Sequence, residues 1–180
     1  MMGHSGSGKS HFAKQLAEQI KAVRLNSDSI RAIMFHDPEE ALNPEGYALV
    51  FGALDYSASE VVKSGHSVIY DSKSNKQSLR DKNSKIAQSN GADHIVLWVE
   101  TPIDKALQRA TERPEALDQR QLSSDKVEVH KNKLFEEPGP DELYIKIDGQ
   151  TSFDEQYKSF VDQLAKLNLR WQFTKHMISP

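Results

Sequence analysis

The chain of 180 residues contains no cysteine, so a disulfide framework and thiolate metal ligands are excluded. No apolar run approaches the length of a membrane span, and the first residues show no signal-peptide pattern. Neither sign of charge prevails, because 23 lysines and arginines stand against 26 aspartates and glutamates, for a net charge of −3. The sequence therefore has no general electrostatic attraction to nucleic acid, and it predicts a cytoplasmic protein that does not bind membranes.

The most specific motif present covers residues 3–10, which match the complete G-x-x-x-x-G-K-[ST] pattern of a phosphate-binding loop. Its members are Gly3, His4, Ser5, Gly6, Ser7, Gly8, Lys9 and Ser10. The glycines let backbone N–H groups point at a β-phosphate, at the N-terminus of a helix. Lys9 is expected to reach the β- and γ-phosphates, and the Ser10 hydroxyl to ligate Mg²⁺. The motif predicts ATP and Mg²⁺ as cofactors.

A linker or a dinucleotide-binding loop would fit this glycine-rich segment less well. A flexible glycine–serine linker would not be followed by a helical apolar face such as Phe12, Leu16 and Ile20. The dinucleotide fingerprint G-x-G-x-x-G fails because His11 occupies the position of its last glycine.

Beyond the loop, strand-like and helical segments alternate, which indicates an α/β fold with a mainly parallel sheet flanked by helices. We predict strands at 22–26, 67–71, 94–100 and 143–147. We predict further helices at 29–36, 47–63, 76–89, 102–113, 123–135 and 153–167. Thr101 is expected to cap the helix that begins at Pro102. One domain is expected over residues 1–168, followed by a tail at 169–180.

Two acidic residues stand at the carboxyl ends of predicted strands, where ligands bind in open parallel sheets. Asp28, after the strand 22–26, is expected to be the base that accepts a proton from an acceptor hydroxyl. Capping of the next helix by Ser27 or Asp28 is an alternative that is compatible with this role. Asp71, at the end of strand 67–71, is expected to hold Mg²⁺ directly or through water, against a capping or turn role.

Three arginines are expected to contact the substrates. Arg31, one helical turn after Asp28, would clamp the acceptor, unless it lies on a solvated face. Arg109 and Arg113 lie on one helical face before Pro114, and they would open a lid at about 109–123 that stabilises charge on the transferred group. The alternative for this pair is surface contact with Glu112 or Asp104, and Arg80 and Arg120 are weaker candidates for substrate or lid contacts.

In this order, the loop, Asp28-x-x-Arg31, the strand ending in Asp71 and Arg109-x-x-x-Arg113 resemble the polynucleotide-kinase-like and zeta-toxin-like P-loop kinases, with an ATP-binding domain of the AAA-33 type. The resemblance reaches to about Leu167. It implies a three-layer P-loop kinase fold and transfer of the γ-phosphate of MgATP to a hydroxyl of a small molecule or a nucleic acid 5′ end. The family often has Asp-x-Asn where this chain has Asp71-Ser72-Lys73, so this loop departs from the family at the asparagine position.

The resemblance also implies a central strand directly before the loop, where this sequence has Met1 and Met2. A sheet without its central strand has unpaired edges and an apolar slot. Three arrangements would account for this. In the first, Met1-Met2 is the stub of that strand in a chain whose start is misassigned or truncated. In the second, a partner chain, such as the second copy in a homodimer, supplies the missing surface; in the third, the alternating segment Leu169-x-Trp171-x-Phe173 fills the slot.

Two functions of other classes stay open. One is a nucleotide-dependent switch or ATPase without a phosphorylated acceptor, against which stand the short length and the absence of a separate small helical domain in the sequence. The other is a catalytically silent nucleotide-binding protein, disabled by the loss of the strand.

Overall fold

The computed structural model of the chain describes residues 1–37, 40, 43–112 and 135–167. The predicted tail 169–180 lies outside these residues, as does nearly all of the predicted helix 123–135. No helix in the described part is both long enough and apolar enough to cross a membrane.

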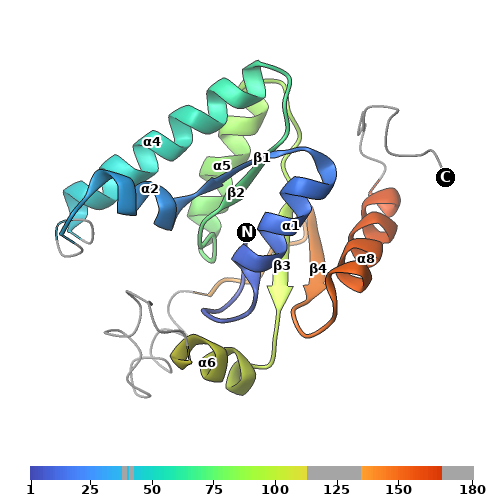
Figure 1. Cartoon of the computed structure of the whole chain (residues 1–180). Helices are drawn as coiled ribbons and strands as arrows, with labels where there is room; N and C mark the ends of the chain where they lie inside the picture. Colours follow the sequence, from blue (N-terminus) through green and yellow to red (C-terminus); the bar gives the residue numbers. More distant parts are fainter. Residues whose placement is uncertain (38–39, 41–42, 113–134, 168–180) are drawn as a thin grey trace.

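The predicted alternation of helices and strands is confirmed along the described chain (Figure 1). In chain order the elements are α1 (Lys9–Ile20), β1 (Val23–Asn26), α2 (Ser27–Met34), α4 (Pro44–Lys63), β2 (Val68–Asp71), α5 (Gln77–Ser89), β3 (Val96–Glu100), α6 (Ile103–Thr111), β4 (Tyr144–Asp148) and α8 (Phe153–Lys166).

At two helix starts the capping differs from the prediction, each time for a local reason. α4 begins earlier than expected because Asn43 caps it, its side chain accepting a hydrogen bond from Gly46 N at 2.8 Å, and Pro44 suits a first helical position. The predicted Thr101 cap of α6 is wrong. The Thr101 hydroxyl donates instead to the carbonyl of Ser7 at 3.0 Å, so it connects the end of β3 to the phosphate loop.

The strands form two parallel pairs. In one pair β1 and β2 end together, with Asn26 opposite Asp71. In the other pair β3 and β4 end together, with Glu100 opposite Asp148. Because parallel strands present their carboxyl ends at one edge, the acids predicted to act on ligands are delivered to a common side of the fold.

Met1 and Met2 lie between the two pairs, where a central strand would run. Met2 forms a parallel bridge with Trp98, and Met1 is bonded to the opposite pair. This arrangement confirms the predicted central position of Met1-Met2. The hydrogen bonds join Met1 N to Tyr70 O (3.1 Å), Ser74 N to Met1 O (2.9 Å), Met2 N to Leu97 O (2.8 Å) and Val99 N to Met2 O (2.9 Å).

Helices cover both faces of the strands, which confirms the three-layer α/β architecture (Figure 1). α1 and α8 pack on one face and on each other, whereas α4 packs on β1 and β2 from the other face, beside α2 and α5. The main core lies under α1 and α8, where Phe12, Leu16 and Phe160 meet Ile145 and Ile147 of β4, all at 0–1% exposure. Burial of these side chains accounts for the apolar face read from the α1 sequence.

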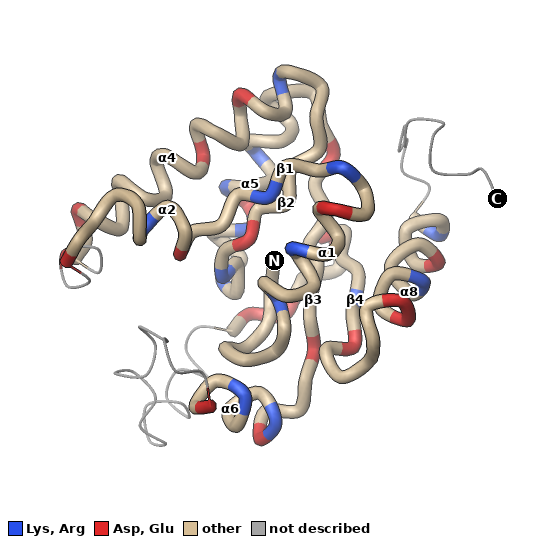
Figure 2. The backbone as a smooth tube through the Cα atoms, viewed as in Figure 1, with Lys and Arg blue, Asp and Glu red and all other residues tan. Residues whose placement is uncertain are grey.

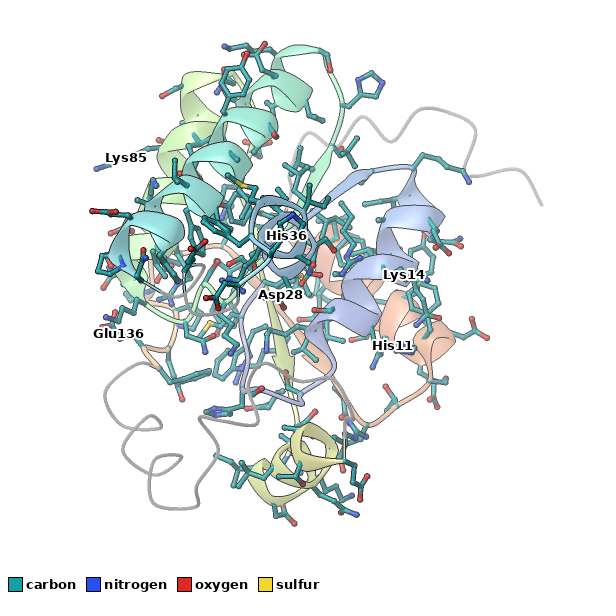
Figure 3. The ribbon with its side chains drawn as sticks, turned by 60° about the vertical axis from the view of Figure 1, so that its left-hand side comes forward. His11, Lys14, Asp28, His36, Lys85 and Glu136 are labelled. Atoms are coloured by element: carbon teal, nitrogen blue, oxygen red, sulfur yellow. The ribbon has the colours of Figure 1, made fainter. Side chains whose placement is uncertain are left out.

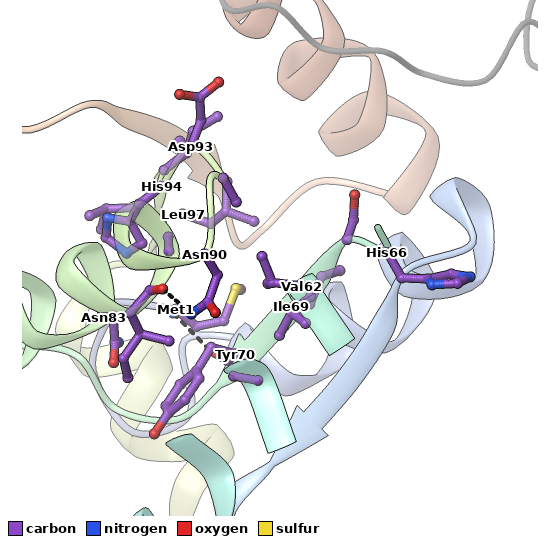
Figure 4. Close-up of a pocket in the computed structure, with 18 of the residues that line it drawn as sticks. Met1, Val62, His66, Ile69, Tyr70, Asn83, Asn90, Asp93, His94 and Leu97 are labelled. Carbon is purple, nitrogen blue, oxygen red and sulfur yellow. Dashed lines mark hydrogen bonds between the residues drawn. The ribbon is translucent and has the colours of Figure 1, made fainter. Parts of the chain in front are cut away.

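A cavity of about 390 Å³ lies next to Met1, between β2 and β3, where the earlier residues of a central strand would run (Figure 4). Its lining comes from both strand pairs, as with Ile69 and Leu97, and from both helical layers, as with Val62 and Phe160. The cavity therefore passes through the sheet layer between β2 and β3. A slot is present where it was expected, but its lining combines apolar side chains with polar ones such as Asn83 and Asn90. The segment 169–173 proposed as one occupant lies outside the described residues.

Candidate active site

The phosphate loop has the backbone geometry that an anion-binding loop requires. Gly6 and Gly8 have positive φ values of 77° and 99°, which residues with a side chain rarely adopt. A Cβ atom on Gly6 would also overlap the carbonyl of Ala106 in α6. Gly8 is the N-cap of α1, so no capping side chain covers the first N–H groups of that helix. Those N–H groups can accept a phosphate.

Lys9 lies folded over its own loop. Its Nζ donates to the carbonyls of Gly3 at 3.0 Å and His4 at 2.6 Å, and the residue is 8% exposed. The ammonium group is thus held against the backbone of the loop that the motif predicts. A bound phosphate would replace these carbonyls as its hydrogen-bond acceptor.

Asn75 anchors the start of the loop, and it was not predicted as a site residue. Its Oδ1 accepts from Gly3 N at 2.9 Å and its Nδ2 donates to Gly3 O at 3.2 Å, so one amide side chain pairs with both backbone groups of a single glycine. The sequence comparison concerned Lys73, because the related kinases often have an asparagine at that position. The signal that could have found the anchor is an asparagine two positions later.

Ser10 and Asp71 come together as predicted. Ser10 Oγ donates to Asp71 Oδ1 at 3.1 Å, and Asp71 is 3% exposed. A hydroxyl and a carboxylate oxygen are the hard ligands that Mg²⁺ prefers, and this ion usually needs few protein ligands because phosphates and water complete its shell. The pair fits that role. No cluster of three or more His, Cys, Asp or Glu that could hold a metal ion occurs among the described residues.

Asp71 also contacts two residues that the sequence did not indicate, Arg24 and Asn26 of β1. Both belong to the strand beside β2, and Asn26 is the register partner of Asp71. The side chains that donate to this carboxylate therefore come from the phosphate-loop helix and from β1.

Asp28 lies in the first turn of α2, at the same edge as Asp71. The alternative that Ser27 or Asp28 caps this helix is wrong, because Asn26 is the cap and its side chain accepts from Ser29 N at 2.8 Å. The Asp28 side chain is 74% exposed and is therefore accessible to a substrate (Figure 3). Its Oδ1 accepts a hydrogen bond from Arg31 Nη1 at 2.6 Å.

Arg31 is largely covered, with a side chain that is 13% exposed. Its Nε is buried and has no hydrogen-bond partner among the described residues, so the alternative of a solvated face does not describe Arg31. Nearby, Tyr47 and Phe51 of α4 pack ring to ring with centroids 4.4 Å apart, and burial raises the pKa of Tyr47. Asp28, Arg31 and this aromatic pair outline the predicted acceptor side.

The predicted arginine pair is only half described. Arg109 lies on α6, and its Nη1 donates to the carbonyl of Gly149, which follows β4, at 2.8 Å. Arg113 and Arg120 lie outside the described residues.

Arg80, a weaker candidate, is buried inside the fold at 1% exposure. It binds Glu142 through Nε at 2.6 Å and Nη2 at 2.9 Å. Arg80 also donates to the carbonyls of Ser74 and Asn75, so it supports the loop anchor from the interior.

The loop geometry and the layered parallel fold define a P-loop nucleotide-binding domain of the kinase type. The sequence matches the AAA domain family AAA_33 over residues 1–138, and the chain belongs to that family. A search of curated proteins found no match.

Solved kinase structures share the fold at low sequence identity. A gluconokinase from Sinorhizobium meliloti 1021 is 21% identical, with a TM-score of 0.63, over 92% of this chain and 90% of that one. A sugar kinase from Janibacter sp. is 20% identical, with a TM-score of 0.66, over 91% of each chain. The APS kinase CysC from Mycobacterium tuberculosis, solved with AMPPNP and APS, is 21% identical, with a TM-score of 0.65, over 91% of this chain and 94% of that one.

Proposed function

We propose that the chain is an ATP-dependent phosphotransferase that moves the γ-phosphate of MgATP to a hydroxyl group. The observation that carries the proposal is the sharing of one sheet edge by three parts. These are the uncapped helix N-terminus with Lys9, the Ser10–Asp71 pair at 3.1 Å and the exposed Asp28 two residues beyond Asn26. A phosphate donor and an acceptor base need this proximity.

The side chains divide into a donor side and an acceptor side. Lys9 and the loop N–H groups would bind the β- and γ-phosphates, and Ser10 with Asp71 would hold Mg²⁺, which neutralises charge on the transferring group. Asp28 would take the proton of the attacking hydroxyl, and Arg31 would orient the acceptor. Arg109 and Arg113 would close a lid over the phosphates, within a domain that reaches residue 168.

A small molecule is the acceptor we favour over a nucleic acid 5′ end. Lysines and arginines are interspersed with acids over the described fold (Figure 2), and the net charge is −3. A nucleic acid substrate would favour a continuous basic track for its phosphates. The sugar kinase and gluconokinase folds named above agree with a small hydroxylated acceptor, by likeness of fold alone.

The test is a screen with γ-labelled ATP and Mg²⁺ against sugars, nucleosides, antibiotics and oligonucleotide 5′ ends. We expect label on one class of small molecule. Label on oligonucleotide ends would replace the favoured acceptor by nucleic acid. ATP hydrolysis without any labelled acceptor would favour a switch or ATPase. Weak MgATP binding that is cured by adding residues before Met1 would favour a silent nucleotide-binding protein.

A further inference from the structure

The donors around Asp71 are divided unevenly between its two oxygens. Ser10 Oγ donates to Oδ1, whereas Oδ2 accepts from Arg24 Nε at 2.9 Å, Arg24 Nη2 at 2.6 Å and Asn26 Nδ2 at 2.8 Å. A carboxylate offers about four lone-pair directions, roughly two on each oxygen. Oδ2 is therefore saturated, and the remaining capacity of the carboxylate lies on Oδ1, beside the Ser10 hydroxyl.

Arg24 brings a full positive charge to the edge where a cation is expected. It lies opposite Ile69 in the β1–β2 register, and its side chain extends along the strand to reach Asp71. The two side chains are 26% and 3% exposed, so water screens the pair weakly on the side of the acid. The charge of the buried carboxylate is thus balanced before any metal ion arrives.

We propose that Arg24 is a positioning residue that sets how this site takes a divalent cation. It fixes Asp71 through Oδ2 and leaves Oδ1, beside Ser10, with the remaining capacity that could hold a cation. Its like charge opposes a free cation. The negative charge of a bound triphosphate overcomes that opposition. The site then takes Mg²⁺ together with ATP, and takes the free ion weakly. This inference rests on the proposed cation role of Ser10 and Asp71.

A purely structural role for Arg24 makes a different prediction. In that case the guanidinium only compensates a buried acid, and its removal weakens the fold without strengthening cation binding. The two roles can be separated by measuring Mn²⁺ affinity of the nucleotide-free protein from the electron paramagnetic resonance signal of free Mn²⁺. This measurement needs neither turnover nor an identified acceptor. It therefore tests the role of Arg24 even if the screen finds no acceptor.

Arg24→Gln is expected to bind Mn²⁺ about tenfold more tightly than the natural chain, because a like charge near the ion is removed. The matched control is Lys14→Gln, which removes an exposed charge from the same shallow surface groove as Arg24, away from Asp71. The control is expected to change the affinity by less than about twofold. Equal or weaker Mn²⁺ binding by Arg24→Gln, in protein shown to be folded by thermal unfolding, would overturn the proposal.

Arg24→Lys keeps the test decisive if the glutamine variant does not fold. Lysine retains the charge and loses the planar fork, so Mn²⁺ affinity should stay within about twofold. A tenfold change in the lysine variant would show that charge is not the cause and would overturn the proposal. Asp71→Asn should abolish the Mn²⁺ response, and an unchanged response would overturn the cation site and the role of Arg24 with it.

Discussion

The two ends of the central sheet position are built differently. At the carboxyl end, Met1 and Met2 are bonded to both neighbouring strands, and Asn75 and Thr101 hold the loop that follows. At the amino end, the same position is a cavity of about 390 Å³. The loop geometry therefore depends on contacts at the carboxyl end, close to Gly3. Met1-Met2 and the covering helices also hold the two strand pairs together.

The largest effect is expected from a substitution in the phosphate loop, at the carboxyl end of the central position. Lys9→Ala removes the ammonium group that would bind the β- and γ-phosphates, so ATP turnover should be abolished and ATP affinity should fall by at least about a hundredfold. Equilibrium dialysis with labelled ATP measures the affinity. Lys14→Ala, an exposed lysine farther along α1, is the control and should leave both unchanged. Unchanged turnover in Lys9→Ala would contradict the loop assignment.

Asp28→Asn tests the acceptor side of the same edge. Phosphoryl transfer to the acceptor found in the screen should fall by about 10²–10⁴-fold, because the proton acceptor is lost. MgATP affinity and stability should be unchanged, since the side chain is 74% exposed. Glu45→Gln, in the first turn of α4, is the control for losing one carboxylate. A parallel fall in transfer and MgATP affinity would argue against a base.

Arg80→Met tests the buried hydrogen bonds that hold Asn75, the anchor of the phosphate loop, to the interior of the fold. The substitution leaves Glu142 and the carbonyls of Ser74 and Asn75 without this buried partner. The free energy of unfolding should fall by about 3 kcal/mol, measured by urea denaturation. Lys85→Met, at an exposed position on α5, should change it by less than about 0.5 kcal/mol. A loss below about 1 kcal/mol for Arg80→Met would mean that this network is not required.

At the amino end of the central position, His94 lines the cavity. We expect the stability of the fold to depend on pH through this residue. Burial, with the nearby amino group of Met1 as a lesser cause, lowers the pKa of His94 to about 4. The unfolded chain binds this proton near its ordinary pKa of about 6.5, so stability should fall as the pH drops from about 6.5 to 4. We expect a loss of about 2 kcal/mol, allowing for the partial exposure of the ring. His94→Asn should remove this dependence, and exposed His66→Gln should keep it, in urea denaturation at each pH.

The smallest effect comes from filling the slot. Ala58 lines the cavity and is 4% exposed, so Ala58→Leu should add apolar contacts there and stabilise the fold by about 1 kcal/mol. Ala106→Leu is the matched change at the loop end, where Ala106 is 0% exposed and its carbonyl lies against Gly6. It should destabilise the fold by about 1–3 kcal/mol through overpacking. Equal thermal shifts of the two variants would contradict the contrast between the ends.

The order of elements could be predicted because it depends on local patterns. The apolar face at Phe12 and Leu16, the strand before Asp71 and the alternation of the two element types are properties of neighbouring residues, and they are confirmed. The meeting of Ser10 with Asp71 followed from the motif together with the rule for carboxyl ends of parallel strands. The roles of Asp28, Arg31 and Arg109 stay predictions.

Other parts of the site depend on which strands are neighbours, and the sequence does not state this. Arg24 contacts Asp71 across 47 residues, and Asn75 contacts Gly3 across 72 residues. Thr101 looked like a helix cap because its local sequence suits one, and the position of Ser7 beside it decided otherwise. Long-range hydrogen bonds therefore override local preference where the loop meets the sheet.

The folding of Lys9 over its own loop has a consequence for ligand selectivity. Its ammonium group already has two carbonyl acceptors, at 3.0 and 2.6 Å, so any anion must compete with acceptors that are always present. A single small anion offers little beyond what the carbonyls provide. A chain of linked phosphates can bind the helix N-terminus and the lysine at once and gains from both. The loop should thus discriminate against inorganic phosphate and sulfate, and calorimetric titrations should record weaker binding of these ions than of the triphosphate.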